Sequence, residues 1–255
     1  MAVPFRRAAD ALALLYRRAD ARQTLGMKRA LYLSVYGWTY WLPILLAGGL
    51  VTLALAVMAW SDHGWVEAVA AALAAVLTLA GLAFFRDPQR RVPAEPGVMV
   101  APADGRVTEV TPLPGYAGLE GPAWRVGIFL SVLDVHVNRS PCAGVVLTTT
   151  YKDGLFLDAR HPDSGARNQS HTLVLADSAT GRPAAVVRQV VGAIARRIIA
   201  PVQPGQRFER GERFGMIAFG SRTELIVPAA DWEPAVRVGT HVAGGRDVLL
   251  RARQA

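Results

Sequence analysis

The chain has 255 residues, a formal net charge of +8, and a hydrophobic content of 52%. This length is enough for one large domain or two small ones with a substantial core. Its single cysteine, Cys142, excludes an internal disulfide and any cysteine-rich metal site, which is consistent with a reducing compartment. A basic chain can bind nucleic acid, but the long apolar segments make an anionic membrane surface the simpler partner, so we expect no nucleic-acid partner.

The first segment, residues 1–30, is basic and amphipathic. Within it Ala8, Leu12 and Leu15 fall on one stripe of a helix, and most of the arginines fall elsewhere. Such a helix can lie among lipid headgroups or pack on a soluble domain as an ordinary helix. The sequence leaves both interpretations open.

Two charge-free segments follow. Residues 30–61 and 68–85 contain no Asp, Glu, Lys, Arg or His. A helix rises about 1.5 Å per residue, so about 20 residues are enough to cross the hydrocarbon of a bilayer. We therefore predict a two-helix membrane hairpin over residues 31–87, with spans at about 41–60 and 65–85 and a tight turn between them.

Basic residues set the expected orientation of this hairpin. Lys and Arg precede the first span and follow the second, whereas the turn between the spans has neither. Loops rich in Lys and Arg stay on the cytoplasmic side of a membrane. We therefore predict that the chain lies in the cell membrane, with the domain after the hairpin on the cytoplasmic side.

Residues 88–255 consist of short β-rich runs separated by Gly and Pro. The expected strands lie at residues 98–100, 105–110, 124–130, 144–150, 171–175 and 184–191. Many short strands at close spacing are typical of a sandwich or barrel. Two turn segments also resemble those of biotinyl and lipoyl carrier domains. The predicted fold is a mainly β soluble domain, barrel-sandwich or hybrid-like with some α structure, anchored by the N-terminal hairpin.

Gly220 and Ser221 lie between two apolar runs that we expect to be strands. A plain turn is the ordinary interpretation of a Gly-Ser pair. Alternatively, a serine hydroxyl beside an unhindered glycine carbonyl can attack its own peptide bond. The pair alone does not decide between a turn and a self-processing site.

Other polar motifs stand at the ends of the expected strands. They supply Asp104, His136, Asn138, Arg139, His161 and Asn168. Asp104 lies in an Asp-Gly corner, which by itself indicates a turn. The loop that contains His161 and Asn168 is either a plain surface crossing or a lid that holds an acidic substrate. The histidine spacings fit no standard zinc pattern, so we expect no metal.

Taken in order, these motifs resemble the phosphatidylserine decarboxylase family, specifically its short form. The resemblance runs from Phe-Phe-Arg-Asp-Pro at residues 84–88, through the Asp104, His136 and Asn168 motifs, to Phe-Gly-Ser-Arg at residues 219–222. It covers roughly residues 82–228 and the preceding hairpin. Each motif alone is weak, and the specificity lies in their order and spacing.

The resemblance implies that the chain cuts itself between Gly220 and Ser221. The Ser221 hydroxyl would attack the Gly220 carbonyl, and elimination and hydrolysis would leave a covalent pyruvoyl group, derived from Ser221, on a small subunit of residues 221–255. This group would form a Schiff base with the amine of phosphatidylserine and draw electrons as CO2 leaves, which gives phosphatidylethanolamine. The expected partners are phosphatidylserine, anionic membrane lipids and the chain's own small subunit.

The resemblance also implies catalytic roles. By match to the family, His136 protonates the carbanion left by decarboxylation, and Asp104 activates self-cleavage. Long-form members carry a second histidine where this chain has Arg139, and an arginine cannot act as a base at ordinary pH. The base for Ser221 is therefore left open.

Substrate contacts are expected from the remaining polar residues. Arg139 is suited to bind a carboxylate or phosphate in bidentate fashion. The other expected contacts are Asn138, His161 and Asn168.

Other functions stay open at this point. The same chemistry could act on a related serine phospholipid, because nothing visible in the sequence fixes the acyl chains. A non-enzymatic, membrane-anchored adaptor would keep an intact chain and tolerate replacement of Ser221. A serine hydrolase is disfavoured because Ser221 does not lie in a Gly-x-Ser-x-Gly motif. The sequence does not decide whether the chain forms a homo-oligomer.

Overall fold

The structure is a computed structural model, and it describes residues 33–158, 161, 163–178, 180–193, 197–218 and 221–253. The contacts divide the chain into two compact units, with the division between Pro88 and Gln89. The basic segment at residues 1–30 and Gly220 lie outside the described residues.

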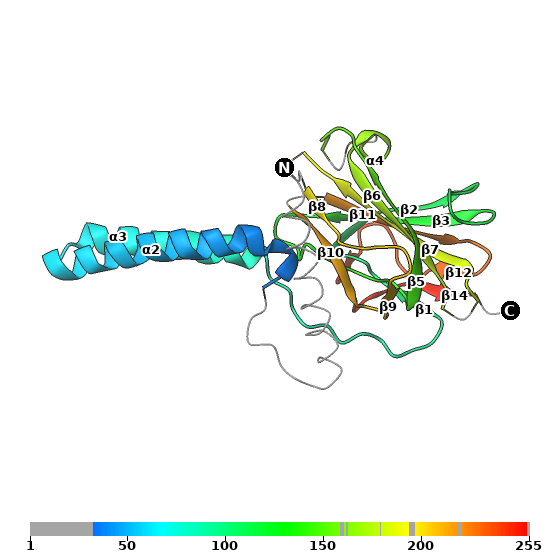
Figure 1. Ribbon diagram of the computed structural model, residues 1–255, viewed down its shortest axis with the longest axis horizontal. Coiled ribbons are helices and arrows are strands. Elements are labelled where there is room, and N and C mark those ends of the chain that lie inside the picture. The colour runs from blue at the N-terminus through cyan, green and yellow to red at the C-terminus, as the bar shows by residue number, and fades with distance from the viewer. Residues whose placement is uncertain are drawn as a thin grey trace. The chain divides into compact units, whose positions relative to one another are not determined.

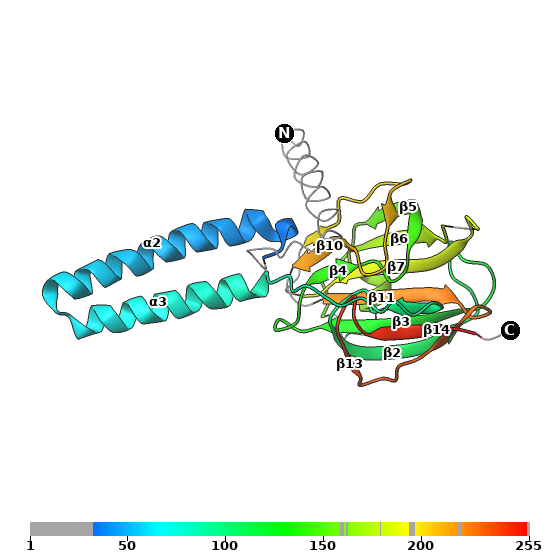
Figure 2. The same ribbon diagram turned by 90° about the horizontal axis from the view of Figure 1, so that it is seen from below.

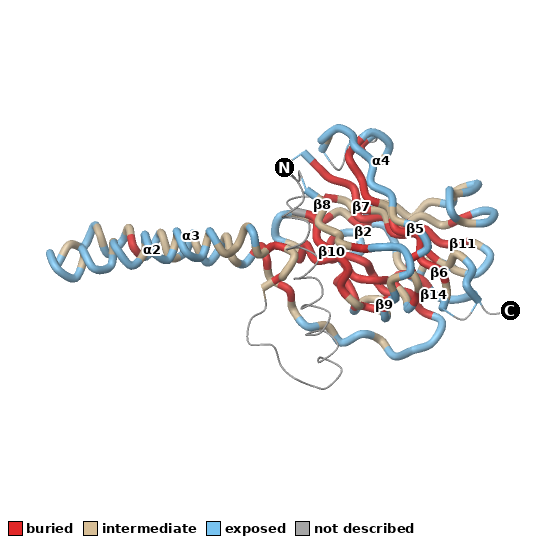
Figure 3. The backbone as a smooth tube through the Cα atoms, viewed as in Figure 1, coloured by how far each residue is buried: buried red, intermediate tan, exposed pale blue. Residues whose placement is uncertain are grey.

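The first unit is a helical hairpin (Figure 1). A 3-10 turn, η2 (Val35–Gly37), leads into α2 (Trp38–Asp62), and α3 (Trp65–Phe84) returns along it. His63, in the left-handed conformation, ends α2. The segments Val35–Asp62 and Trp65–Phe84 are both long and apolar enough to cross a membrane. Figure 3 shows their surfaces as largely exposed, as a lipid-facing hairpin would be.

Small residues allow the two helices to approach each other. A Cβ added at Gly48 would lie 2.2 Å from the hydroxyl of Thr78. That hydroxyl is itself bonded to the carbonyl of Ala74 at 2.7 Å. Glycine at such a contact is typical of helices that associate within lipid, where packing drives association.

Aromatic side chains close the base of the hairpin. Phe85 stacks on Tyr40 with ring centroids 6.2 Å apart. The Phe85 carbonyl accepts the Ser34 amide at 2.7 Å, and the Trp41 indole donates to the Ser34 carbonyl at 2.8 Å. These contacts hold the entry to α2 against the exit from α3.

The second unit is mainly β (Figure 2). Its largest sheet has eight strands in the order β13-β2-β3-β11-β7-β6-β5-β9, and neighbouring strands are antiparallel. The strands are β2 (Gly105–Leu113), β3 (Ala123–Leu130), β5 (Gly144–Lys152), β6 (Ser170–Ala176), β7 (Pro183–Val191), β9 (Arg207–Phe208), β11 (Ser221–Pro228) and β13 (His241–Val242).

Two three-stranded sheets, with orders β1-β14-β12 and β4-β10-β8, accompany the large one. Their strands are β1 (Val98–Val100), β4 (Val137–Arg139), β8 (Arg197–Ile199), β10 (Arg213–Ala218), β12 (Trp232–Pro234) and β14 (Val248–Ala252). A short helix, α4 (Ser164–Arg167), lies between β5 and β6. The predicted fold class, a mainly β domain preceded by two apolar helices, is confirmed.

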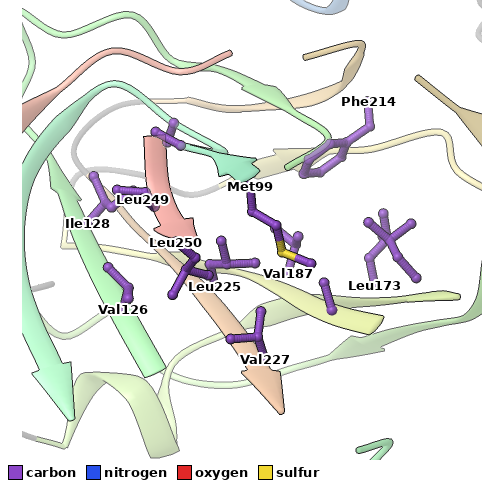
Figure 4. Close-up of a cluster of buried hydrophobic side chains, with 14 of the residues drawn as sticks. Met99, Val126, Ile128, Leu173, Val187, Phe214, Leu225, Val227, Leu249 and Leu250 are labelled. Atoms are coloured by element: carbon purple, nitrogen blue, oxygen red, sulfur yellow. The ribbon is translucent and has the colours of Figure 1, made fainter. Parts of the chain in front are cut away.

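The main core lies on the inner face of the eight-stranded sheet (Figure 4). Leu225 and Val227 of β11 pack there with Met99 of β1 and Leu250 of β14, so the small sheet β1-β14-β12 contributes to the same core. Ile226, between the two β11 residues, belongs to a second cluster on the outer face.

Because of this alternation, the first residues of β11 are divided between the two faces of the sheet. Successive side chains of a strand point to opposite faces, so Ser221 and Thr223 lie on the inner face with Leu225. Arg222 and Glu224 lie on the outer face. The residue expected to react is therefore on the core side of the sheet.

Candidate active site

Strand register brings the predicted motifs to one end of the eight-stranded sheet. Ser221, the first residue of β11, pairs with Leu130 of β3 and with Val191 of β7. Extending the β2–β3 register by one residue places Gly105 opposite Leu130. Asp104 therefore precedes β2 about 10 Å from Ser221 across the sheet, which is two strand spacings.

Ser221 is fully buried, and its Oγ has no hydrogen-bond partner among the residues that the structure describes. An unsatisfied buried hydroxyl costs roughly 1–3 kcal/mol. Its cross-strand neighbours Leu130 and Val191 are also fully buried. The hydroxyl is thus kept away from water, and within the described structure its lone pairs are not occupied by another donor.

His136 lies beside the strand that leads to the Gly-Ser pair. It is fully buried, and its carbonyl accepts the amide of Ile217 in β10 at 3.2 Å. Its Nδ1 lies 2.9 Å from the carbonyl oxygen of Asp134. Since a carbonyl can only accept, neutral His136 carries its proton on Nδ1, and Nε2 is the basic nitrogen.

The Asp134 side chain holds the loop that carries this carbonyl. One carboxylate oxygen accepts from the Ser131 amide at 2.8 Å and the Ser131 hydroxyl at 2.7 Å, and the other lies 3.1 Å from His241 Nε2. Burial opposes the charge, but the hydrogen bonds from Ser131 and then His241 outweigh it and lower the pKa of Asp134. An ionised Asp134 thereby fixes the loop that orients His136.

Asp104 is buried in a second polar cluster. One carboxylate oxygen lies 2.6 Å from the Arg90 guanidinium, and the other accepts the Gly244 amide at 2.8 Å. Burial raises the pKa of Asp104, and the opposing effects of Arg90, the Gly244 amide and Arg139 do not cancel it. A carboxyl group with a raised pKa exchanges a proton nearer neutral pH, as acid–base groups do.

Arg139 is buried on β4 near Asp104. Its Nη1 donates to the Gly211 carbonyl at 3.1 Å, and its charge acts to lower the pKa of Asp104. It is only 4% exposed. The structure therefore places Arg139 inside the domain, where its substrate-binding role stays a prediction.

A buried hydrogen-bonded chain crosses the inner face one step from the reactive end of β11. Asn138 Nδ2 donates to Thr223 Oγ1 at 3.1 Å, and Gln189 Nε2 donates to Asn138 Oδ1 at 2.8 Å. His171 Nδ1 lies 3.0 Å from Gln189 Oε1, and His171 Nε2 lies 2.6 Å from Thr149 Oγ1. The chain spans β11, β4, β7, β6 and β5, so it fixes the strands around the site relative to one another.

The donor groups determine the direction of each hydrogen bond in this series. Because the Gln189 amide donates to Asn138, Gln189 Oε1 must accept, and His171 carries its proton on Nδ1. Burial lowers the pKa of His171 despite the bond to Gln189, which favours the neutral ring. Gln189 and Thr223 were not among the predicted site residues. The available signal was a glutamine inside the apolar run at residues 184–191.

Asn168 fastens the loop that follows β5. Its Nδ2 lies 2.8 Å from both the Leu157 and Val191 carbonyls, and its Oδ1 accepts the Leu157 amide at 2.9 Å. Val191 is the residue that pairs with Ser221, so the Asn168 amide lies next to the reactive row. His161 is exposed, and its Nδ1 accepts the Asp163 amide at 3.2 Å. The expected substrate contacts of Asn168 and His161 stay predictions.

The outer face of β11 carries an ion-pair ladder. Glu224 is 1% exposed, and its carboxylate lies 2.9 Å from Arg222 and 3.5 Å from Arg188. Arg222 also contacts Glu109, which lies 2.7 Å from Arg125 Nε. Arg188 donates to a carbonyl within α4, so the ladder attaches the loop that carries α4 to the sheet.

Charged and polar side chains in this region are bound mainly by other protein groups. In the described part of the chain, no cluster of three or more His, Cys, Asp or Glu residues is suited to hold a metal ion. At the start of β11, the hydroxyl of Ser221 is a buried nucleophile without a hydrogen-bond partner among the described residues.

Comparison with known proteins identifies the family of the chain. The model of the family described as phosphatidylserine decarboxylase matches residues 77–250. The chain belongs to the phosphatidylserine decarboxylase family. Asp104, His136, Asn168 and Ser221 all lie within the matched range. The resemblance that the sequence motifs suggested is therefore confirmed.

Curated relatives support the same membership. Proteins named phosphatidylserine decarboxylase proenzyme are 42% identical to this chain in Gluconacetobacter diazotrophicus, 41% in Trichlorobacter lovleyi and 43% in Symbiobacterium thermophilum. These similarities cover 82%, 82% and 86% of this chain, and 91%, 89% and 94% of the respective relatives. The likeness to decarboxylase proenzymes thus extends over most of both chains.

Proposed function

We propose that this family member is a proenzyme that cuts itself between Gly220 and Ser221 and then converts phosphatidylserine to phosphatidylethanolamine. The observation that carries the proposal is the state of Ser221. Its hydroxyl is fully buried, has no partner among the described residues and lies at the end of the sheet where Asp104 and His136 also lie. The relatives' designation as proenzymes supports a processed precursor.

Self-cleavage uses only the chain's own groups and one water. Ser221 Oγ bonds to the Gly220 carbonyl carbon as the peptide C–N bond breaks, and the released amine takes a proton. Loss of the Ser221 α-proton then breaks the Cβ–Oγ bond, which releases the Gly220 carboxylate and leaves dehydroalanine. Addition of water and loss of ammonia leave a pyruvoyl group on residues 221–255. Glycine suits the first step because no side chain obstructs the attack.

Two groups are assigned to the proton transfers. Asp104, whose pKa is raised by burial, activates the chain for self-cleavage. His136 protonates the substrate carbon after CO2 has left: Nε2, its basic nitrogen, first takes a proton from water and then passes it to the carbon, since imidazole transfers protons near neutral pH. Arg139 cannot take either role, since guanidinium does not lose its proton at ordinary pH.

The surroundings of Ser221 suit decarboxylation. Once formed, the pyruvoyl group supplies a carbonyl that condenses with the substrate amine and accepts electrons as CO2 leaves. Buried Leu130 and Val191 flank this position and solvate a carboxylate poorly, which favours its loss as neutral CO2. The groups assigned to the polar parts of the lipid are Arg139, Asn138, His161 and Asn168.

We further propose that α2 and α3 anchor the enzyme in the cell membrane, with the β unit on the cytoplasmic side. The lengths and hydropathies of the helices support the anchor. The turn between them lacks Lys and Arg, which supports the orientation. Trp60 and Trp65, near this turn, are 86% and 76% exposed, as expected for aromatic residues at a bilayer interface.

The test is a lipid assay on the purified full chain in nanodiscs that contain phosphatidylserine. We expect formation of phosphatidylethanolamine and CO2 by the wild type, and neither product with Ser221→Ala. A related serine phospholipid in the same assay measures selectivity for the lipid backbone. A cleaved, folded wild type that forms no phosphatidylethanolamine would reject the substrate assignment and retain the self-processing.

A further inference from the structure

Two loops at the Ser221 end of the sheet expose large apolar side chains. In the loop that follows β3, Val132 is 48% exposed and Leu133 is 83% exposed. In the loop that follows β5, Leu155 is 43% and Phe156 is 42% exposed. Single exposed apolar residues are ordinary, but a pair of them on each of two loops, at the end of the sheet that carries a candidate active site, indicates a contact surface.

The register shows that both loops leave the sheet at the same end. Lys152, the last residue of β5, pairs with Ser170 of β6, and Ser170 pairs with Val190 of β7. Val190 pairs with Arg222 of β11, and Arg222 pairs with Phe129 of β3. The chain therefore leaves β5 in the row next to Ser221, and it leaves β3 one residue later, at Leu130 in the row of Ser221 itself.

Both loops are held in place at their bases. The Leu155 amide donates to the Arg167 carbonyl at 2.8 Å, and the Leu155 carbonyl accepts the Gln169 amide at 3.1 Å. In the other loop, the Ser131 contacts of Asp134 close a turn beneath Leu133. The apolar side chains are thus presented outward by ordered backbone.

Aromatic and basic groups lie beside the loop that follows β5. Tyr151 is 52% exposed. Partial burial raises its pKa, the charge of Asp153 raises it further, and the charge of Arg197 lowers it, so both charged groups lie near Tyr151. Lys152 is exposed and donates to a backbone carbonyl at 3.0 Å. Arg167 is 59% exposed, although Asp163 lies 3.9 Å from it.

We propose that this rim, defined as Val132, Leu133, Tyr151, Leu155 and Phe156, docks on the surface of an anionic phospholipid bilayer, from which the site takes its lipid. Apolar, aromatic and basic side chains on one surface are the combination that binds the bilayer interface. The chain's net charge of +8 and its two apolar helices favour this occupant over a protein partner. The inference rests on the proposed function for the identity of the lipid, whereas docking itself does not require turnover.

Docking is tested in the full-length Ser221→Ala chain, reconstituted into vesicles of phosphatidylcholine and phosphatidylglycerol. Single cysteines replace Leu133 or Phe156 and carry a polarity-sensitive dye. The matched control is a cysteine at Leu147, which is 38% exposed within β5. Cys142, the single native cysteine, is replaced by serine in all of these chains, so that only the introduced thiol is labelled.

The expected result is a blue shift at positions 133 and 156 and quenching by a quencher attached to the lipid. The dye at position 147 should show neither effect. Dyes at 133 and 156 that remain as water-exposed as the dye at 147 would overturn the proposal. A blue shift that depends on protein concentration and resists the lipid quencher would also overturn it, because it would indicate contact between copies of the chain.

A kinetic comparison connects docking to the reaction. We expect Leu133→Asp combined with Phe156→Asp to slow turnover of bilayer phosphatidylserine by about tenfold or more. Self-cleavage and turnover of a water-soluble, short-chain phosphatidylserine should be retained, and Leu147→Asp should change neither. Unchanged turnover of the bilayer substrate would overturn the role of docking in lipid capture. A wild type that is inactive on both bilayer and short-chain phosphatidylserine would instead reject the proposed function. The dye experiment would still test docking, because it uses a chain that does not turn over the lipid.

Discussion

The two faces of β11 carry different kinds of polar group: neutral groups on the inner face and charged groups on the outer face. On the inner face, Ser221 and Thr223 are uncharged, and Thr223 belongs to the chain of neutral hydrogen bonds through Asn138. On the outer face, Arg222 and Glu224 belong to a ladder of ion pairs. Both sets are largely buried.

We infer from this difference that the inner face serves the reaction and the outer face stabilises the fold. On the inner face, neutral hydrogen bonds through Asn138 hold Thr223, two residues after the reactive serine. On the outer face, ion pairs link β2, β3, β11 and β7 to one another, and Arg188 links them to the loop that carries α4. Substitutions on the inner face should therefore alter self-cleavage and turnover, whereas those on the outer face should alter stability. The following changes test this division, from the largest expected effect to the smallest.

Ser221→Ala should abolish self-cleavage completely, because it removes the attacking oxygen, and should leave the fold intact. Intact mass after purification measures the cleavage. The matched control is Ser140→Ala, since Ser140 is also buried but its hydroxyl donates to the Cys142 carbonyl at 2.7 Å. The control should cut itself normally. Cleavage of the Ser221→Ala chain would contradict the assignment.

His136→Gln should reduce decarboxylation by about 10²- to 10⁴-fold, because it removes a positioned proton donor. Self-cleavage should still go to completion, since it is assigned to Asp104. Asp104→Asn should accumulate the intact chain, which also forms no phosphatidylethanolamine because the pyruvoyl group arises only after self-cleavage. Mass and lipid product are measured on both variants, with His63→Asn in the hairpin turn as the control. Equal loss of both steps in His136→Gln would show that one histidine serves both.

Glu224→Gln should lower the free energy of unfolding by about 2–4 kcal/mol, because it leaves Arg188 and Arg222 facing a neutral group. The range is reduced below that for a fully buried pair, since the arginine side chains are 13% and 15% exposed. Urea unfolding followed by circular dichroism measures the effect. The rate of self-cleavage in the folded chain should stay within about twofold of wild type.

Thr223→Val should cost only about 1–2 kcal/mol, the effect of one buried hydrogen bond left unmade by Asn138. It should nevertheless slow self-cleavage more than Glu224→Gln does, because Thr223 follows Ser221 on the same face. Cell-free synthesis with timed sampling gives the cleavage rates. A faster rate in Thr223→Val than in Glu224→Gln would remove the distinction between the faces.

Acidification offers the smallest test. Burial opposes the charge of Glu109, but contacts with Arg125 and Arg222 outweigh it and lower its pKa below 4.5. The folded form therefore binds fewer protons, so this stabilisation is present above about pH 4.5 and is lost as the pH falls toward the lowered value. With Glu109→Gln, the free energy of unfolding should change less steeply with pH over that interval. An unchanged slope would show that Glu109 contributes no such stabilisation.

The fold class was predictable because it depends on local pattern. Long charge-free segments indicate apolar helices, and short β-rich runs between Gly and Pro indicate strands. The register was not predictable, because it depends on which distant strands pair. Gln189, for example, contacts Asn138 only because β4 lies over the inner face of the large sheet.

The candidate site was predictable only as far as its motifs are contiguous in sequence. Asp104, His136 and Ser221 were found by resemblance, and their roles remain proposals. The ion pair of Asp104 with Arg90 and the amide of Gly244 could not be inferred, since those partners come from separate parts of the chain. The same holds for Asn168, whose side chain is engaged by Leu157 and Val191.

The most direct test of the central claim is the intact mass of the purified, folded wild-type chain. We expect two fragments, residues 1–220 and 221–255, with the smaller one lighter by one ammonia than a fragment that begins with an unmodified serine. Borohydride reduction in the presence of phosphatidylserine should add the lipid to that fragment alone. A single full-length species in a folded preparation, or a small fragment with a free N-terminal serine, would contradict the account.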